Sequence, residues 1–318
     1  MSEIKVAVVG ARGYVGFELI QLLDQHPLTK LVAAYSREYE GKPVSEVVSS
    51  FSDKQLCYCA DSLESLDDRE FDVIFLALPN DIAAKHARLW QKISKHACII
   101  DLSSDFRFDD SWIYAQPETC ADKIIGQSLI ANPGCYATAS QLGLLPIIDM
   151  LGDVPNIFGV SGYSGAGSKP SDKNDPEKLS DNLMAYKLVD HIHEREVSKV
   201  LGHKVYFMPH VASFFRGIHL TISVKLNVSI EVDEIKNIYS DYYKKHQLIN
   251  VTADIPEVKD VQNTHQVNIG GFTMKNGHLV LCVTIDNLLK GAATQAIQNM
   301  NLALSKQYDL EINTGIQL

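Results

Sequence analysis

The sequence predicts an α/β fold in two parts: a parallel, doubly wound sheet first, then an α+β part with a mixed, largely antiparallel sheet. Two observations support this prediction. Up to residue 107, apolar strand-like runs alternate with helical segments, a pattern typical of parallel sheets covered by helices. After residue 135, strand-like runs follow one another with one clear helix among them. We therefore expect a second domain to begin near that residue.

The first part opens with residues 4–27, in which a buried strand leads through a glycine turn into an amphipathic helix that ends at Pro27. The right-handed crossover rule then leaves few topologies for the strands that follow. The further expected elements are strands at 31–38, 71–80 and 97–107, with a helix at 81–96.

The second part contains successive strand-like runs without a helix between each pair, which predicts a sheet with helices on one face. Its expected elements are strands at 205–212, 217–228, 265–274 and 278–286, and a helix at 229–245. The segment 290–307 returns to a helical period, so we expect it to pack back on the first part. The predicted domains are residues 1–134 with 290–318, and residues 135–289.

Composition excludes several classes of function. The net charge of −10 argues against a nucleic-acid or anionic-membrane surface. The six cysteines form no CxxC pair, which argues against a metal centre or a disulfide framework. No apolar run approaches the about 20 residues of a membrane span, and no secretion signal is evident. We expect a reduced, cytoplasmic protein that binds neither nucleic acid nor membrane, and a sheet-mediated homodimer or homotetramer.

Three glycines mark the first strand–helix turn. Gly10, Gly13 and Gly16 are spaced GxxGxxG, and glycines at this point let the backbone approach a pyrophosphate on the helix N-terminus. The usual fingerprint is GxGxxG, so a tight turn in some other α/β protein is the alternative. The strand–turn–helix–strand context favours a Rossmann-type dinucleotide site.

The end of the next strand indicates which dinucleotide is bound. NAD-specific proteins tend to place an acidic residue about 20 residues past the glycines, whereas this chain has Ser36 and Arg37. A hydroxyl and a guanidinium suit the 2′-phosphate of NADP, and Arg12 in the glycine turn can contribute. Glu38 nearby leaves open that Arg37 is a solvated surface charge. We expect NADP (NADPH) as the cofactor.

Cys135 lies between the Asn-Pro-Gly turn 132–134 and an apolar run of helical period. Most cysteines are small core residues. In the first turn of a helix, however, unpaired N–H groups and the helix dipole lower a thiol pKa and favour the nucleophilic thiolate. A reactive thiol and a dinucleotide site together suggest one reaction type: the thiolate attacks an activated acyl group, and the thioester exchanges hydride with the nicotinamide.

Such chemistry needs an acid or base near the thiol and an anion site for a phosphate leaving group. His191 and His193, with Tyr186 upstream, are the candidates for the first role, although a lone histidine is more often structural. The pair could also belong to a metal site, but no other ligand cluster is evident. Arg107 and Arg216 are the candidate phosphate-binding residues, beside the Ser/Gly-rich segment SGYSGAGS.

Eight segments in order across the chain resemble one family: GARGYVG, LALPN, DLSSDFRF, NPGCYAT, SGYSGAGS, HIHERE, PHVASFFRGI and DNLLKGAATQAIQNMN. The sequence is similar to N-acetyl-gamma-glutamyl-phosphate reductases, the arginine-biosynthetic members of the aspartate-semialdehyde-dehydrogenase-like group. The resemblance implies a Rossmann-type NADP-binding domain and a substrate and dimerisation domain. It also implies NADPH-dependent reduction of N-acetyl-L-glutamyl 5-phosphate to the 5-semialdehyde, with phosphate release through a cysteine thioester.

The same resemblance assigns site residues. It implies Cys135 as the nucleophile and His191 as the acid/base, and Glu196 matches a glutamate of the same motif. The residues implied to bind the cofactor are Gly10, Arg12, Gly13, Tyr14, Val15, Gly16, Ser36, Arg37, Pro79, Ser161, Gly162, Gly165 and Asn287. Together with the candidates named above, the residues we expect to bind substrate are Arg107, Asn132, Tyr186, His193 and Arg216.

Two other readings stay open. A related reductase acting on an N-succinyl-glutamyl or aminoadipyl phosphate would use the same chemistry, and Ile192 stands where the family usually has arginine. The other class is a non-enzymatic NADP-binding redox sensor in which Cys135 is an oxidation switch. The presence of both His191 and Arg107 argues against the sensor, which requires neither.

Overall fold

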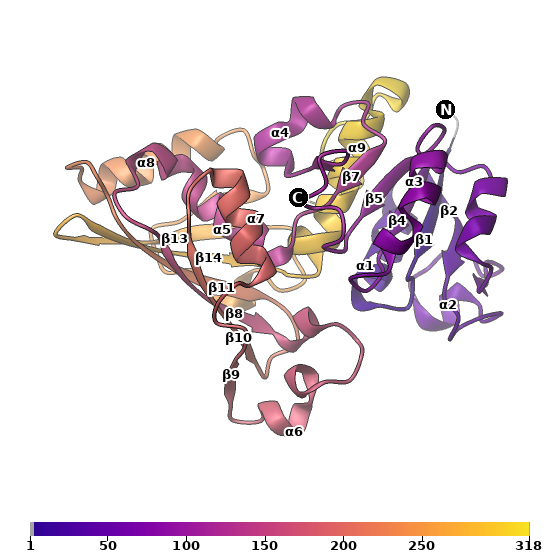
Figure 1. Cartoon of the computed structure of the whole chain (residues 1–318), viewed down its shortest axis with the longest axis horizontal. Helices are drawn as coiled ribbons and strands as arrows, with labels where there is room; N and C mark the ends of the chain where they lie inside the picture. Colours follow the sequence, from indigo (N-terminus) through magenta and orange to yellow (C-terminus); the bar gives the residue numbers. More distant parts are fainter. Residues whose placement is uncertain (1–2, 318) are drawn as a thin grey trace. The chain divides into compact units, whose positions relative to one another are not determined.

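The computed structural model describes residues 3–317, which form two compact units (Figure 1). The first unit contains the chain up to Pro133 together with Ala292–Gln317, and the second contains Gly134–Gly291. The domain ends that we expected at residues 1 and 318 lie outside the described residues. None of the helices formed by residues 3–317 has both the length and the apolar character needed to cross a membrane.

The first unit is built on a seven-stranded sheet in the order β3-β2-β1-β4-β5-β7-β6, with every pairing parallel. The doubly wound parallel sheet predicted from sequence is therefore confirmed. Its central strands are buried on both faces, as the continuous apolar runs predicted. The strands are β1 (Ile4–Val9), β2 (Thr29–Tyr35), β3 (Tyr58–Cys59), β4 (Val73–Leu76), β5 (Cys98–Asp101), β6 (Ile113–Tyr114) and β7 (Leu129–Ala131).

Helices accompany this sheet in the order expected for parallel crossovers. They are α1 (Tyr14–Gln25), α2 (Val44–Val47), α3 (Ala87–Ile93), α4 (Pro117–Ile124) and α9 (Thr294–Tyr308), with 3₁₀ turns at Leu63–Asp68 and Ala83–His86. Because the strands are parallel, the segments that leave β1, β2 and β4 emerge at the same edge of the sheet. The strand order reverses beside β1, which is where dinucleotides bind in open sheets of this kind.

The second unit is built on a seven-stranded mixed sheet in the order β12-β13-β14-β11-β8-β10-β9. Only β8 with β10 and β12 with β13 pair in parallel; the other pairings are antiparallel, as predicted. The strands are β8 (Asn156–Gly162), β9 (Leu183–Ala185), β10 (Tyr206–Ala212), β11 (Ile218–Lys225), β12 (Ile249–Val251), β13 (Val267–Lys275) and β14 (His278–Ile285).

Helices cover one face of this second sheet (Figure 1). Helix α5 (Cys135–Leu144) packs on β11 and β14, α8 (Val232–Tyr243) packs on β13, and α7 (Ile192–Leu201) packs on β10 and on α5. A short helix, α6 (Pro176–Leu179), lies in the long β8–β9 connection. Along β11 the alternate residues Ile218, Leu220 and Ile222 are buried, whereas those between them are only half-buried. The opposite face of the sheet is therefore more open.

Helix α5 is held at its C-terminal end by two tyrosines of α8. The Tyr239 hydroxyl donates to the Gly143 carbonyl oxygen at 2.5 Å, and the Tyr243 hydroxyl donates to the Leu142 carbonyl oxygen at 2.6 Å. Both hydroxyls are buried, and the last carbonyls of a helix have no partner within the helix. Gly143 also lets α5 approach the sheet, because a Cβ there would lie 2.5 Å from Cδ1 of Ile222.

We predict that Tyr239→Phe lowers the free energy of unfolding by about 1 kcal/mol, since it removes one buried hydrogen bond. Tyr239→Ala should cost about 3–5 kcal/mol, since it also leaves a cavity. Chemical denaturation monitored by fluorescence measures both. The matched control is Tyr242→Phe on the same helix, because Tyr242 is 41% exposed. Equal destabilisation by Tyr239→Phe and Tyr242→Phe would contradict the prediction.

Candidate active site

The glycine turn after β1 requires glycine at two of its three positions. Gly10 has a φ of +84°, and a Cβ there would lie 2.2 Å from the Ala77 carbonyl oxygen. A Cβ on Gly16 would lie 2.6 Å from the Gly10 carbonyl oxygen, so this glycine lets α1 pack closely on the turn. At Gly13 a Cβ would meet only an ordinary contact at 3.6 Å, so the turn does not require glycine there.

The N-terminus of α1 is suited to an anion. Gly13 is its N-cap and offers no side-chain acceptor, and the first turn contains no acidic residue. The first N–H groups of the helix thus lack an intrahelical partner, and the positive end of the helix dipole is not neutralised by a carboxylate. Tyr14 and Val15, both half-buried, form the start of this helix. A pyrophosphate fits the chemistry of this terminus.

Arginines flank the turn on the side of β2. Arg37 is exposed just beyond the end of β2, and its side chain forms no ion pair or hydrogen bond with residues 3–317. The Arg12 guanidinium lies 2.8 Å from the Glu38 carboxylate, and both side chains are largely exposed. Ser36 is buried, and its Oγ accepts the Tyr39 N–H at 3.3 Å. The cation best placed for a phosphate is therefore Arg37, while Glu38 competes for Arg12.

Three further predicted residues lie in the first unit. Pro79 is exposed after β4, at the same sheet edge as the glycine turn. Arg107 is buried and donates from Nε to the Asn132 carbonyl oxygen and from Nη2 to the Leu102 carbonyl oxygen, at 3.0 and 3.1 Å. The Asn132 amide bonds to Asn299 and to the Ala292 carbonyl oxygen. Arg107 and Asn132 therefore already hold the backbone before Cys135 in place.

Cys135 is the first residue of α5 and is half-buried. Its helix has a glycine N-cap without a side-chain acceptor, and no acidic residue in the first turn. This environment favours a thiolate. By contrast, burial raises the pKa of Cys98 to about 12 and also raises the pKa of Cys282. A Cβ on Gly291 would lie 2.9 Å from the Cys135 Cβ, so the chain after β14 passes directly against the nucleophile.

Helix α7 brings the two predicted histidines next to α5. His191 is its N-cap: the His191 Nδ1 accepts the backbone N–H of His193 at 3.2 Å. Glu196, one turn further, is 1% exposed, and its Oε2 accepts the backbone N–H of Gly134 at 3.0 Å. The other oxygen of Glu196 lies 3.8 Å from Nε2 of His193. A buried carboxylate thus joins α7 to the residue that precedes the nucleophile.

Aromatic rings enclose these groups. The His191 ring centroid lies 4.8 Å from that of His193, 5.3 Å from that of Phe207 and 5.8 Å from that of Tyr186. Burial raises the pKa of the Tyr186 hydroxyl, and the neighbouring Cys135 thiol adds to the shift. The rings of Tyr186, His191, His193 and Phe207 therefore form one cluster, and Glu196 of the same helix binds the N–H of Gly134, the residue before Cys135.

A second cluster gathers the residues after β8 and β14. Ser161 and Gly162 end β8, and a Cβ on Gly165 would lie 2.8 Å from Ser161 Oγ. The Asn287 side chain accepts the Gly217 N–H at 2.7 Å and donates to Ser164 Oγ at 2.9 Å. Asn287 thus holds two loops together through its amide.

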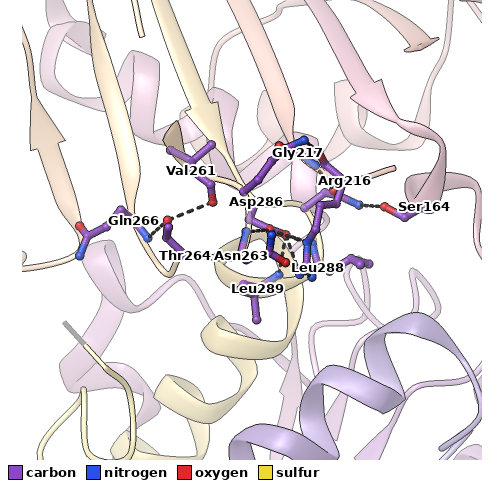
Figure 2. Close-up of polar contacts among 12 residues, drawn as sticks. Ser164, Arg216, Gly217, Val261, Asn263, Thr264, Gln266, Asp286, Leu288 and Leu289 are labelled. Atoms are coloured by element: carbon purple, nitrogen blue, oxygen red, sulfur yellow. Dashed lines mark hydrogen bonds and ion pairs between the residues drawn. The ribbon is translucent and has the colours of Figure 1, made fainter. Parts of the chain in front are cut away.

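Arg216 is ion-paired in this structure. Its Nε lies 2.6 Å from Asp286 Oδ2 and its Nη1 donates to Asn263 Oδ1 at 2.8 Å (Figure 2). Asp286 also accepts the backbone N–H groups of Leu288 and Leu289, at 2.9 and 3.2 Å. The guanidinium we expected to bind substrate phosphate therefore shares its charge with a carboxylate and organises the segment after β14.

Three of these partners were not predicted as site residues. Glu196 was noted only because it matches a glutamate of the family motif. It lies three residues after His193, and this spacing places both residues on one side of a helix. Ser164 and Asp286 adjoin predicted residues in sequence, which was the available signal. Among residues 3–317, no group of three or more His, Cys, Asp or Glu side chains is arranged to hold a metal ion.

Two family models match the two units in turn. Residues 5–127 match "Semialdehyde dehydrogenase, NAD binding domain", and residues 135–287 match "Semialdehyde dehydrogenase, dimerisation domain". Among solved structures, aspartate semialdehyde dehydrogenase II from Vibrio cholerae covers 97% of this chain and is itself covered in full, with a TM-score of 0.79 at 20% identity. That likeness shows the fold.

Curated relatives are closer in sequence. An N-acetyl-gamma-glutamyl-phosphate reductase from Xylella fastidiosa is 48% identical, over 95% of this chain and 93% of the relative. Protein arg-6, mitochondrial, from Neurospora crassa is 49% identical over 94% of this chain, but the chain spans only about a third of that protein, 35% of its length. The chain therefore belongs to the family of N-acetyl-gamma-glutamyl-phosphate reductases.

Proposed function

We propose that the chain reduces N-acetyl-L-glutamyl 5-phosphate to N-acetyl-L-glutamate 5-semialdehyde with NADPH, releasing phosphate, as a step of arginine biosynthesis. The observation that carries this proposal is the position of Cys135 as the first residue of α5, next to the His191–His193–Glu196 segment of α7. The 48% identity to a reductase of this name over nearly its full length supports the choice of substrate.

The chemistry of the chain's own residues begins with Cys135. Its thiolate attacks the acyl carbon, a C–S bond forms, and the carbonyl electron pair moves onto oxygen. When this oxyanion collapses, the C–O bond to phosphate breaks and phosphate leaves with the bonding pair. The N–H groups at the start of α5 favour the thiolate over the thiol. His191 is the second catalytic residue we assign.

Glu196 positions these groups and does not react itself. Its buried carboxylate accepts the Gly134 N–H and faces His193, so it joins the turn before Cys135 to the first turns of α7. Such support matters because small displacements of reacting groups cost orders of magnitude in rate.

The residues of the first unit fit NADP. The N-terminus of α1 suits the pyrophosphate, because its first turn has no acidic residue, and Arg37 suits the 2′-phosphate. Ser161, Gly162, Gly165 and Asn287 stay predictions for the nicotinamide side. The chemistry that NADPH supplies when bound is hydride donation to the thioester.

We also propose that the chain forms a homo-oligomer through its second unit. The half-buried face of the second sheet, in the unit that matches a dimerisation domain, supports a homodimer or homotetramer in which this face is covered. Sedimentation of the purified chain measures this directly. The cytoplasmic location stays a prediction, and the Neurospora relative carries "mitochondrial" in its name.

We predict that the purified protein reduces NADP with N-acetyl-glutamate semialdehyde and phosphate, the reaction run backwards, and that Cys135→Ser lowers the rate at least about a thousandfold. Cys57→Ser is the matched control, because Cys57 is an exposed thiol. Rates with the N-succinyl and aminoadipyl analogues, followed by NADPH absorbance, test the acyl group. A preference for one of the analogues would contradict the N-acetyl-glutamyl assignment. Tight NADP binding without turnover of any of these substrates would favour the redox sensor.

We predict that Arg37→Ala raises KM for NADPH about tenfold to a hundredfold and leaves KM for NADH unchanged, because it removes a charge-assisted contact to the 2′-phosphate. Steady-state kinetics with both cofactors measure this. Glu38→Ala is the control: it frees Arg12 from its ion pair and should not raise KM for NADPH. An unchanged NADPH/NADH ratio in Arg37→Ala would show that Arg37 is only a surface charge.

A further inference from the structure

We propose that Asp286 is a positioning residue for the nucleophile: its carboxylate holds the turn 286–291 against Cys135 and cancels the charge of Arg216 beside it. Asp286 has no part in the steps proposed above. The inference rests on the proposed function for its effect on acylation, because Cys135 is the nucleophile of that same reaction.

The turn 286–291 touches the nucleophile directly. A Cβ on Gly291 would lie 2.9 Å from the Cβ and 3.4 Å from the Cα of Cys135. The Gly291 N–H donates to the Asp286 carbonyl oxygen at 2.9 Å, and that oxygen would lie 3.1 Å from the same added Cβ. Gly291 is therefore packed between Asp286 and Cys135, so that a shift of Asp286 reaches the nucleophile through one residue.

The Asp286 carboxylate fixes the shape of this turn. The side chain is fully buried, and its Oδ1 accepts the backbone N–H groups of Leu288 and Leu289 (Figure 2). Its Oδ2 accepts the Asn263 N–H at 2.8 Å. The residues that follow form a π-helical turn, Leu289–Ala293, a rare element that occurs often at functional sites. One carboxylate thus determines how this turn begins and attaches it to the loop before β13.

Arg216 compensates the burial of this carboxylate. Its Nε lies 2.6 Å from Oδ2 of Asp286 and its Nη2 donates to Oδ1 at 3.2 Å, and the arginine side chain is only 12% exposed. A buried charge acts strongly on its neighbours unless an opposite charge accompanies it. Because the two charges are paired, Cys135 is exposed to neither alone. Removing one of them should therefore change the ionisation of the thiol, in a direction set by the charge that remains.

Other ionisable groups interact with the pair, with the thiol or with the residue before it. They are His265, Glu196, Tyr136 and Tyr186. Burial lowers the pKa of His265, and the two members of the pair shift it in opposite directions: Asp286 raises it and Arg216 lowers it. Burial raises the pKa of both tyrosines, which keeps them protonated. These four groups stay the same in the variants below, so a difference between variants reports the pair.

Alkylation of Cys135 by iodoacetamide, followed by the mass of its peptide, measures the effect on the thiol, because this reagent is uncharged and reacts with the thiolate. Asp286→Asn leaves the charge of Arg216 uncancelled, and Arg216→Gln leaves that of Asp286. We expect the alkylation profile to move to lower pH in the first variant and to higher pH in the second, by about one pH unit each. The variant with both substitutions should lie near wild type.

Single-turnover phosphate release from the acyl phosphate, without NADPH, measures the positioning. At a pH above both alkylation midpoints the thiol is ionised in wild type and in Asp286→Asn alike, so a remaining difference in rate reports position. We expect Asp286→Asn to be at least about tenfold slower there, because its amide offers one acceptor oxygen where the carboxylate offers two. The matched control is Asp254→Asn, since Asp254 is exposed.

A conservative variant keeps the test valid if Asp286→Asn does not fold, as judged by its unfolding transition. Arg216→Lys retains a cation at this position, so its alkylation profile should stay near that of wild type. The profile of Arg216→Gln should still move to higher pH. This comparison tests the cancelling of charge without any change at Asp286.

The outcomes also separate this inference from the proposed function. Profiles that move in the same direction in Asp286→Asn and Arg216→Gln, or not at all, would overturn the inference, because a solely structural role gives that result. Phosphate release by Asp286→Asn at the full wild-type rate would overturn the positioning of Cys135. If wild type releases no phosphate while the two profiles move in opposite directions, the proposed function is wrong and the link from Asp286 to Cys135 stands.

Discussion

The hydrogen bond from the Gly134 N–H to the Glu196 carboxylate joins the turn before α5 to helix α7, and the proposed chemistry depends on it. A buried carboxylate is costly unless its oxygens find partners. Here one oxygen takes the Gly134 N–H and the other faces His193. Because Gly134 is the N-cap of α5 and Glu196 belongs to α7, this hydrogen bond ties the start of the helix that carries Cys135 to the helix that carries His193.

The N-termini of α5 and α7 are completed in different ways. At α5 the N-cap is a glycine without a side-chain acceptor and the first turn contains no acidic residue, which favours a thiolate at Cys135. At α7 the His191 side chain is the cap, and its Nδ1 accepts the His193 N–H. The unpartnered N–H groups of a helix start are therefore met by a side chain at α7, whereas the N-cap of α5 offers no side-chain acceptor. The Tyr239 and Tyr243 hydroxyls hold the opposite end of α5.

The fold class could be predicted because it follows from the spacing of apolar residues. Strands β1 and β4 are continuous apolar runs, typical of a buried parallel sheet, whereas apolar and polar residues alternate along β11. The sequence did not predict β8, because its glycines are typical of a turn. In the structure Gly159 allows the Tyr136 ring to pack against this strand, since a Cβ there would lie 2.7 Å from the ring. The sequence also did not predict α7, which has few apolar residues. The Asp286 partner of Arg216 lies 70 residues further along the chain, a pairing that only the fold creates.

The measurement that tests the central claim most directly is the mass of the Cys135 peptide after the protein is incubated with N-acetyl-glutamate semialdehyde and NADP in the absence of phosphate, then quenched in acid. Without phosphate the thioester has no acceptor other than water. We predict an N-acetyl-glutamyl group on Cys135, absent from Cys135→Ser. An unmodified Cys135 in protein that still reduces NADP, or an acyl group on another residue, would contradict it.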